Sequence, residues 1–449
     1  MKPLLILLGK LMIKILQLCK KNAGNLPGCV LWYLTHHQCV SLFTVNCPII
    51  AVTGTNGKTS VTNYLCQLFQ KTGANVITNH AGNNLDTGIC SLLLQYCNWR
   101  GQIQADYLVL ETDESHIPVV YDQLKLETLI VLNFFRDQLD RNGEVETLIR
   151  KVNDFCKTFN GNLILNGDDP NTARLGRANP HNPNVQYFHV EPYAFATHTL
   201  FEAGEGKFCP FCGTALSYDY YQYSHIGKFH CPGCGYGTHP PDVVTTDVNL
   251  DPPSFRIGKQ TYTTALSSIY HIYNMTAVVA AAKCYHIDQN LLTQVISHYT
   301  VNNGRMETFQ MGTNEVILNL AKNPVGANMT LRVMNETDEE KELLFVLNDN
   351  IADGLDVSWI WDINFSTFHR VTRVITAGTR AYDIAVRIKC SGYDPDKIVV
   401  RPELKDAVQE LHTTQGKKFI IANYTAVQPT RIALQRWITR HGGVVHETP

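Results

Sequence analysis

The sequence has almost no net charge and no long apolar run. Across its 449 residues, 38 Lys and Arg stand against 40 Asp and Glu, a formal charge of -2. No global field therefore attracts or repels nucleic acid, and any polyanion must be bound by a local site. No uninterrupted apolar stretch reaches the roughly 18 residues of a membrane-spanning helix. No small-residue cleavage site follows the apolar N-terminus, which argues against a signal peptide.

The chain does have length, apolar volume and cysteine. Hydrophobic residues make up 44% and aromatic residues 10% of the sequence, which excludes a disordered chain. At about 100–200 residues per domain, the length predicts two or three domains. Most of the 14 cysteines stand singly in apolar stretches, as Cys66 and Cys284 do. This distribution favours a reduced, cytoplasmic protein over a disulfide-bonded one.

The N-terminal twenty residues predict an amphipathic helix. Lys10, Lys14, Gln17 and Lys21 recur at helical spacing and form one polar stripe among Leu, Ile and Met. One interpretation is a helix docked on its own domain. The other is a peripheral contact with the inner face of the membrane, with the lysines toward anionic headgroups.

A strand, a glycine loop and a helix follow one another early in the chain. Residues 48–53 form a short apolar run, and a helical pattern ends near Gly73. In such a loop, backbone N–H groups and the helix N-terminus bind phosphate, Lys58 reaches the β- and γ-phosphates, and the Thr59 hydroxyl binds Mg²⁺. The loop itself consists of Gly54, Thr55, Asn56, Gly57, Lys58 and Thr59. The sequence therefore predicts a nucleotide phosphate site.

Three more apolar strands, at 107–110, 128–132 and 162–165, each end in polar residues. Such strands, alternating with helical patterns, predict an α/β domain with a parallel sheet whose carboxyl strand ends form one site. Glu111 is the predicted magnesium carboxylate. Asp168 and Asp169 at another strand end are either site residues or helix N-caps.

Two CxxC pairs, separated by 18 residues, lie between about residues 200 and 240. This spacing fits a tetrahedral zinc ribbon that leaves no open metal position for catalysis. The predicted zinc ligands are Cys209, Cys212, Cys231 and Cys234. A redox pair, which needs only one CxxC, is the weaker alternative.

Three later motifs complete a family resemblance. They are Tyr273 to Ala277, Gly304 to Glu307 and Ala321 to Pro324. With the phosphate loop and Glu111, they resemble the Mur ligase superfamily from about residue 45 to the end. The resemblance implies an ATP-dependent ligase that joins a carboxylate to an amine. It also implies that Asn274 reads adenine and that Arg305 and Lys322 contact ATP.

The departures from that pattern favour amidation. Gln138 stands where amino-acid-adding members have a magnesium-binding histidine, and Asn319 stands where they have an aspartate. Only about 45 residues precede the loop, too few for a UDP-binding domain. With the inserted ribbon, these features resemble the members that amidate lipid II in peptidoglycan biosynthesis. In those, an acyl phosphate on the D-isoglutamate α-carboxylate is attacked by ammonia, giving D-isoglutamine.

The resemblance also implies a partner. It is a class I glutamine amidotransferase subunit of the GatD type, which forms a heterodimer with the ligase and hydrolyses glutamine to ammonia. The chain has no Gly-x-Cys-x-Gly nucleophile elbow of its own, because Gly88 to Leu92 lacks the second glycine. Ammonia must then come from such a partner or from solution.

The C-terminal part predicts a Rossmann-like α/β domain. Strands are expected at 315–320, 342–347, 373–377, 397–400 and 418–421, and helices at 325–334, 381–389, 404–411 and 429–440. Residues 348–362 follow a strand and hold four aspartates and two of the five tryptophans. They are either a capped turn with core tryptophans or functional. Asp349 is the favoured residue, because it directly ends the strand and the resemblance implies an active-site aspartate there, assigned to the ammonia side.

The predicted organisation is residues 1–44 as N-terminal helix and lead-in, 45–304 as ATP-binding domain and 305–449 as ligase domain. Asp349, Lys58 and Glu111 are the predicted catalytic residues. Two rival functions stay open. One is an amino-acid-adding ligase of the Mur or folylpolyglutamate type, and the other is a nucleotide-binding protein without catalysis.

Overall fold

The computed structural model describes residues 2–20, 23–79, 83–136, 144–199, 205–299, 306–336 and 338–441. The chain forms two compact units. Unit 1 comprises residues 1–135, 145–199 and 206–299, and unit 2 comprises residues 136–144, 200–205 and 300–449. The predicted boundary at residue 304 stays a prediction, because residues 300–305 lie outside the described part. Among the described residues, no helix combines the length and hydropathy needed to span a bilayer.

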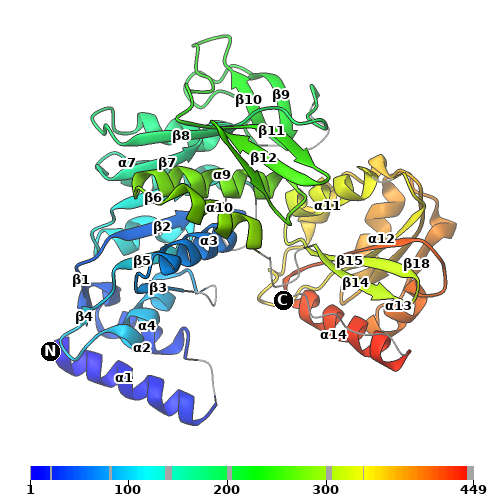
Figure 1. The fold of residues 1–449 in the computed structure, drawn as a ribbon. Coiled ribbons are helices and arrows are strands. Elements are labelled where there is room, and N and C mark those ends of the chain that lie inside the picture. Colours follow the sequence, from blue (N-terminus) through cyan, green and yellow to red (C-terminus); the bar gives the residue numbers. More distant parts are fainter. Residues whose placement is uncertain are drawn as a thin grey trace. The chain divides into compact units, whose positions relative to one another are not determined.

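Unit 1 is built on a nine-stranded sheet in the order β13-β12-β11-β8-β7-β6-β2-β5-β3 (Figure 1). The strands from β11 to β3 are parallel to their neighbours, and β12 and β13 add an antiparallel edge. Their bounds are β2 (Ile49–Thr53), β3 (Val76–Thr78), β5 (Tyr107–Glu111), β6 (Thr128–Val131), β7 (Asn162–Asn166), β8 (Val185–Val190), β11 (Val243–Leu250), β12 (Pro253–Ile257) and β13 (Gln260–Thr263). The predicted parallel sheet of the α/β class is confirmed.

Helices cover both faces of this sheet, because its central strands are apolar on both sides. On one side α3 (Lys58–Lys71), α9 (Ile269–Cys284) and α10 (Gln289–His298) pack together and on the strands. On the other side, α4 (Asp86–Tyr96), α5 (Ile117–Tyr121) and α7 (Val145–Cys156) share one core with alternate strand residues. The short strands β1 (Thr44–Val45) and β4 (Gln102–Ile103) pair beside this layer.

The N-terminal helix α1 (Lys2–Leu18) is docked on unit 1. It packs with α2 (Leu26–Leu34) and α4, and buries Ile6, Gly9 and Ile13. Lys10 Nζ donates a hydrogen bond of 2.9 Å to the Leu94 carbonyl. A Cβ on Gly9 would lie 2.7 Å from a Leu94 methyl group, so glycine permits this close packing. The predicted docking on the helix's own domain is confirmed.

The four-cysteine segment is inserted between β8 and β11, which are neighbours in the sheet. It contains an antiparallel hairpin of β9 (Ser217–Tyr223) and β10 (Ile226–His230). A separate small core holds it together, and Tyr218 packs against that core. The core residues are Ala173, Cys209, Phe229, Cys231 and Tyr236. Insertion between paired strands leaves the parent sheet intact.

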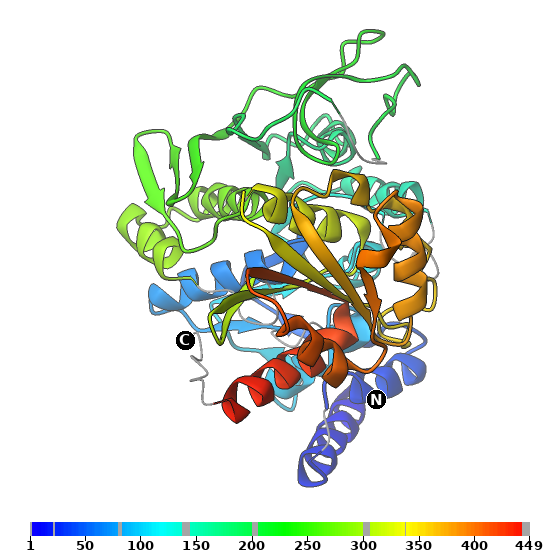
Figure 2. The ribbon, with the colours of Figure 1, turned by 90° about the vertical axis from the view of Figure 1, so that its right-hand side faces the viewer.

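Unit 2 is a six-stranded sheet in the order β14-β15-β19-β16-β17-β18, parallel except for β14. Its strands are β14 (Glu307–Met311), β15 (Asn314–Leu320), β16 (Lys341–Val346), β17 (Val371–Ala377), β18 (Ile398–Val400) and β19 (Lys417–Ala422). The helices α11 (Pro324–Glu336) and α12 (Ala381–Cys390) cover one face, and α13 (Leu404–Leu411) and α14 (Tyr424–Arg440) cover the other (Figure 2). The predicted α/β layering is confirmed here too.

Two details of unit 2 differ from the prediction. Strand β14 was not expected, because this edge strand has no continuous apolar run. The last helix begins at Tyr424, five residues before the predicted start at Pro429. The Asp353 carboxylate accepts hydrogen bonds from the Thr425 backbone N–H and hydroxyl and so stabilises the first turn. This contact, from a residue distant in sequence, helps to set the start of the helix before the proline.

Candidate functional site

The predicted phosphate loop lies between β2 and α3, and its glycines are required by geometry. Gly54 and Gly57 have φ angles of 127° and 93°, which glycine adopts without strain. A Cβ on Gly57 would lie 2.3 Å from Asn274 Oδ1, and one on Gly54 would lie 2.9 Å from the Asn133 backbone nitrogen. Backbone amides at the N-terminus of α3 therefore sit in a cradle of the kind that binds phosphate.

Lys58 is buried beside this loop. Its Nζ donates hydrogen bonds to the Gly54 carbonyl at 2.5 Å and to Glu114 Oε1 at 3.2 Å. Glu114 is itself buried, and its role was not predicted from the sequence. The only signal in the sequence is a second carboxylate three residues after Glu111. The structure thus adds Glu114 to the site as the partner that holds the Lys58 ammonium.

The structure brings Thr59 and Glu111 together, as predicted from the strand ends. Thr59 Oγ1 donates to Glu111 Oε2 at 2.8 Å, and Asn84 Nδ2 donates to Glu111 Oε1 at 3.3 Å. The Asn79 side chain bonds both the N–H and the carbonyl of Glu111. A hydroxyl and a carboxylate beside a phosphate loop are the oxygen donors that Mg²⁺ prefers. These residues fit a magnesium ion held between the protein and a nucleotide.

Asp113 adds a further negative charge that interacts with Lys58. It accepts hydrogen bonds from the Ser115 N–H at 3.0 Å and from the Ser115 hydroxyl, and its Oδ1 lies 3.4 Å from His116 Nδ1. Burial opposes ionisation, but the hydrogen bonds from His116 and Ser115 and the charge of Lys58 lower the pKa of Asp113. The carboxylate is therefore ionised at neutral pH and contributes to a site suited to cations.

Asn133, at the end of β6, fixes the loop from the other side. Its Oδ1 accepts from the Asn56 N–H at 2.8 Å, and its Nδ2 donates to the Asn56 carbonyl at 3.0 Å. The Thr55 hydroxyl likewise donates to the Phe135 carbonyl and accepts from the Phe135 N–H. The segment that follows β6 thus positions the loop before any ligand is bound.

The two acids after β7 are structural. Asp169 is the N-cap of α8 (Pro170–Ala173), accepts from the Asn171 N–H at 2.8 Å, and also accepts from the Phe134 N–H. Asp168 accepts from the Val190 N–H at 3.0 Å and from the Tyr273 hydroxyl at 2.7 Å. Of the two interpretations left open, the capping role therefore holds for Asp169, and Asp168 joins β8 to α9.

Asn274, on α9, presents a buried amide over the loop. Its Oδ1 faces Gly57, while its Nδ2 has no hydrogen-bond partner among the described residues. A buried donor without a partner is rare in folded proteins, because it forfeits its hydrogen bond to water. The position beside the phosphate loop fits an acceptor on a bound nucleotide.

The remaining predicted ATP contacts lie elsewhere in the chain. Arg305 lies outside the described residues, as does Gln138. Lys322 follows β15 at the carboxyl edge of the unit 2 sheet. Asn319 is buried within unit 2, where it donates to Thr330 Oγ1 at 2.7 Å and accepts from the Met306 N–H at 3.1 Å.

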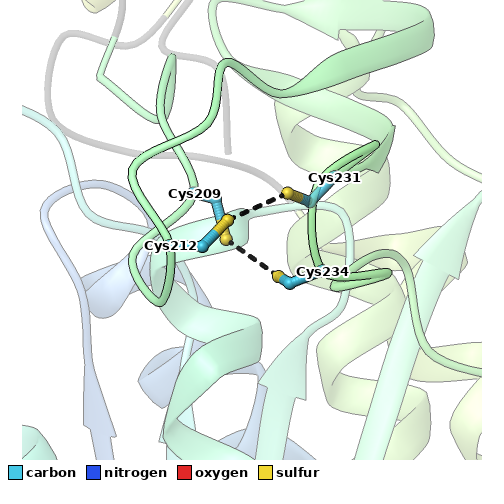
Figure 3. A group of neighbouring side chains, drawn as sticks. All are labelled: Cys209, Cys212, Cys231 and Cys234. Carbon is cyan, nitrogen blue, oxygen red and sulfur yellow. Dashed lines mark hydrogen bonds between the residues drawn. The ribbon is translucent and has the colours of Figure 1, made fainter.

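The four predicted zinc ligands converge (Figure 3). Their sulfur atoms all lie within 4.8 Å of one another. The Cys209 and Cys234 sulfurs are 3.5 Å apart, and the Cys212 and Cys231 sulfurs are 3.4 Å apart. Zn–S bonds of about 2.3 Å in a tetrahedron place neighbouring sulfurs roughly 3.8 Å apart. The cluster therefore fits a structural Zn²⁺ with four thiolate ligands.

Asp349 lies at the carboxyl edge of the unit 2 sheet, after β16. Thr379 Oγ1 donates to its Oδ1 at 2.8 Å, and Arg380 donates to its Oδ2 at 3.3 Å. The hydrogen bond from Thr379 lowers the pKa of Asp349, partial burial opposes this, and Arg380 lowers it further. With 31% of its side chain exposed, Asp349 is an ionised group available to another molecule.

The rest of the 348–362 segment is mainly structural. Asp353 supports α14, and Asp356 accepts from the Ser358 N–H at 2.8 Å at the start of a 3-10 turn (Ser358–Asp362). Trp359 packs against the core of unit 2, whereas Trp361 is 54% exposed. The interpretation as a capped turn with core tryptophans therefore holds for Asp353, Asp356 and Trp359, is wrong for Trp361, and leaves Asp349 unexplained.

Comparison with known families matches both units. The Mur ligase middle domain matches residues 52–229, and the MurT ligase C-terminal domain matches residues 320–427. The chain is 30% identical over 434 residues to the MurT subunit of lipid II isoglutaminyl synthase (glutamine-hydrolyzing) from Staphylococcus aureus, covering 96% of this chain and 97% of that protein. It is 32% identical over 413 residues to the subunit of the same name from Streptococcus pneumoniae, covering 90% and 91%.

Solved structures show the same fold. A pseudomurein peptide ligase type C from Methanothermus fervidus superposes with a TM-score of 0.67 at 21% identity, covering 88% of this chain and 80% of that one. MurF from Acinetobacter baumannii superposes with a TM-score of 0.63 at 17% identity, covering 92% and 80%. With the matches along nearly the whole sequence, the conclusion is that the chain belongs to the Mur ligase superfamily and, within it, to the MurT family of lipid II isoglutaminyl synthase subunits.

Proposed function

We propose that this chain catalyses the ATP-dependent amidation of lipid II during peptidoglycan synthesis. The substrate group is the α-carboxylate of D-isoglutamate in the stem peptide, and the product is D-isoglutamine. The phosphate loop is the observation that carries the proposal. In it, Lys58 donates hydrogen bonds to the Gly54 carbonyl and to Glu114, and Thr59 donates to Glu111. The near full-length similarity to subunits named for this synthase supports the choice of substrate.

The first step activates the carboxylate. One of its oxygens attacks the γ-phosphorus of ATP, the bond to the β–γ bridging oxygen breaks, and ADP leaves an acyl phosphate behind. Lys58 would stabilise the charge on the transferred group once phosphate displaces Glu114 from the ammonium. Mg²⁺, when bound at Thr59 and Glu111, supplies positive charge to the phosphate oxygens. Arg305 and Lys322 are proposed to neutralise the remaining charge.

The second step consumes ammonia. Its nitrogen attacks the acyl carbon, the C–O bond to phosphate breaks, and the amide loses one proton to solvent as phosphate leaves. Neutral ammonia already carries a free lone pair, so no general base is needed to create it. This fits a chain that has Asn319 and Gln138 in place of residues that serve an incoming amino acid.

The ammonia source is proposed to be a glutamine-hydrolysing partner of the GatD type. Both relatives are named as subunits of a glutamine-hydrolyzing synthase. On this chain, the exposed Asp349 edge is the proposed contact, because exposed apolar residues occur in its own segment and in the first turns of α12 and α14, which follow other strands of the same sheet. These are Ile351, Leu355, Tyr382 and Tyr424. An ionised Asp349, oriented by Thr379 and Arg380, would act at the partner's site.

The zinc ribbon is proposed to be structural. Four thiolates fill the tetrahedron and leave no place for substrate. We expect elemental analysis to find one zinc per chain, and Cys209→Ser to lose the metal and lower the melting temperature. Cys390→Ser, at an exposed cysteine far along the sequence, is the matched control and should keep both. A wild-type chain that binds no zinc would contradict the assignment.

Incubation of the purified chain with ATP, Mg²⁺ and lipid II, together with either ammonium or free amino acids, tests the function. Amidation replaces a hydroxyl by an amino group, so phosphate release with a mass loss of about one dalton supports the proposal. A gain of one amino-acid residue would instead support the rival ligase of the Mur or folylpolyglutamate type. No turnover with any acceptor would indicate a nucleotide-binding protein without catalysis.

A further inference from the structure

Helix α1 has an apolar face on each side, and only one is buried in the protein. Ile6, Gly9 and Ile13 point into unit 1. The opposite positions recur at intervals of three and four, so they lie on one face of the helix. They are Leu4, Leu7, Leu8, Leu11, Ile15 and Leu18, with exposed fractions from 38% to 84%. A continuous apolar row on a surface marks an interaction site.

The N-terminal part of the chain, which includes α1, carries positive charges without negative ones. Residues 1–85 contain seven lysines and no aspartate or glutamate. Lys14 and Lys20 on or just after α1 are exposed. The first acidic residue, Asp86, is buried, and its Oδ1 lies 3.7 Å from His116 Nε2. Helix α1 therefore combines an apolar row with lysines and carries no acidic residue itself.

Exposed aromatic residues lie next to this helix. Tyr96, the last residue of α4, and Trp99, in the loop that follows, are exposed, and Arg100 comes next in the chain. The loop touches α1, since a Cβ on Gly101 would lie 2.8 Å from the Ile6 Cδ1 atom and 3.2 Å from the Lys2 Cε atom. Trp and Tyr are the residues enriched where proteins meet the headgroup region of a bilayer.

We propose that the outward face of α1 docks unit 1 on an anionic lipid surface. In both views, α1 forms the end of unit 1 away from the β9–β10 hairpin (Figures 1 and 2). Its apolar row enters the boundary between headgroups and acyl chains, and Lys14 and Lys20 bind the anionic headgroups. The 17-residue helix lies in the plane of the membrane and does not span it.

Anionic lipid is a better occupant of this face than a second copy of the chain. Self-association through α1 would bring two lysine-bearing surfaces without acidic residues together, and like charges would repel. Lipid headgroups instead supply the missing negative charge. The proposal does not depend on the amidation chemistry, so each can fail without the other.

Vesicle binding by the full-length chain, without ATP or lipid II, tests the proposal. The vesicles contain phosphatidylcholine alone or phosphatidylcholine with phosphatidylglycerol. We expect binding to the mixed vesicles, and weaker binding when anionic lipid is absent or salt is added. The double change Leu7→Glu and Leu11→Glu should reduce the partition coefficient about 100-fold or more, because it removes two apolar side chains from the buried row. Lys14→Glu should reduce it about tenfold.

Val386→Glu is the matched control, because it places the same charge at an exposed apolar position on α12 of unit 2. It should bind vesicles like the wild type. Equal melting temperatures of all variants would show that the substitutions act on the surface and not on folding. The proposal is overturned if the wild type does not bind mixed vesicles or if the double variant binds as well. It is also overturned if light scattering shows a dimer that the double variant converts to monomer while vesicle binding is absent.

Discussion

In both units, polar residues follow the strands at the carboxyl edge of the parallel sheet, but they make different contacts. In unit 1, Glu111 and Asn133 turn toward a glycine loop and hold its Thr59 and Asn56. In unit 2, the strand ends bond each other, since Asn423 Nδ2 donates to the Asn348 carbonyl at 2.7 Å, and the adjacent Asp349 stays partly exposed. The parallel sheet supplies the edge in both cases. The glycine loop makes the unit 1 edge a phosphate site. The unit 2 edge instead exposes the Asp349 carboxylate to its surroundings.

The opposite edge of unit 2 contains a buried ion cluster. Glu342 Oε2 lies 2.9 Å from Lys418 Nζ, and Glu342 Oε1 lies 2.9 Å from Arg373 Nε. Glu342 and Lys418 are almost fully buried. Burial lowers the pKa of Lys418, and the hydrogen bond and charge of Glu342 oppose that shift. These groups stabilise unit 2 and play no part in the proposed chemistry.

The largest expected effect comes from breaking this cluster. Glu342→Ala leaves the buried Lys418 ammonium without its carboxylate, while Arg373 keeps Glu410, and should lower the free energy of unfolding by about 3–5 kcal/mol. Denaturant unfolding measures the change. Glu340→Ala, at an exposed position in the turn before β16, is the control and should cost little. Equal stability of the two variants would contradict a structural role for the cluster.

The next effect concerns the unit 1 edge. Lys58→Ala removes the cation that the phosphate loop presents and should reduce ATP-dependent amidation about 100- to 1,000-fold. Because the buried Glu114 also loses its cation, the melting temperature should fall as well, so the rate is measured at a temperature at which both proteins are folded. Lys71→Ala at the exposed end of the same helix is the matched control, and it should keep the wild-type rate. Turnover by the Lys58 variant at the wild-type rate would place the chemistry elsewhere.

A smaller effect distinguishes the role of Asp349 at the unit 2 edge from the amidation chemistry at the unit 1 edge. Asp349→Asn should reduce amidation driven by glutamine and the partner subunit about tenfold, because orienting contacts at an active site have effects of this order. Amidation driven by ammonium should stay the same. Asp356→Asn, at a capping aspartate in the same segment, is the control. If both ammonia sources give the wild-type rate, or if both fail equally, Asp349 has a different role.

The smallest effect compares two glycines with positive φ. A Cβ on Gly73, after α3, would meet no atom of the surrounding described residues within 4 Å, whereas one on Gly57 would meet Asn274. Gly73→Ala should therefore cost only the backbone strain, about 1 kcal/mol, and keep nucleotide affinity. Gly57→Ala should weaken ATP binding as well. Calorimetric titration with ATP measures both, and equal affinities would show that the Gly57 contact is unimportant.

The sequence predicted most of what depends on local pattern. The apolar runs located the central strands, and because parallel strand ends meet at one edge, Thr59 and Glu111 could be placed together. The pairing of Lys58 with Glu114 could not, since it joins residues 56 positions apart and depends on the path of the chain after β5. Strand β14 was missed because it lacks a continuous apolar run and is stabilised by pairing with β15, the next strand in the chain. The start of α14 was missed because it depends on Asp353, which lies 72 positions before Thr425.

Transfer of heavy oxygen from the substrate carboxylate tests the central claim most directly. Lipid II labelled with heavy oxygen in the D-isoglutamate α-carboxylate would be incubated with the chain, ATP, Mg²⁺ and ammonium. Because the carboxylate attacks the γ-phosphorus, we expect one labelled oxygen in each inorganic phosphate released. Amidation that leaves the released phosphate unlabelled would contradict an acyl phosphate at the Lys58 site.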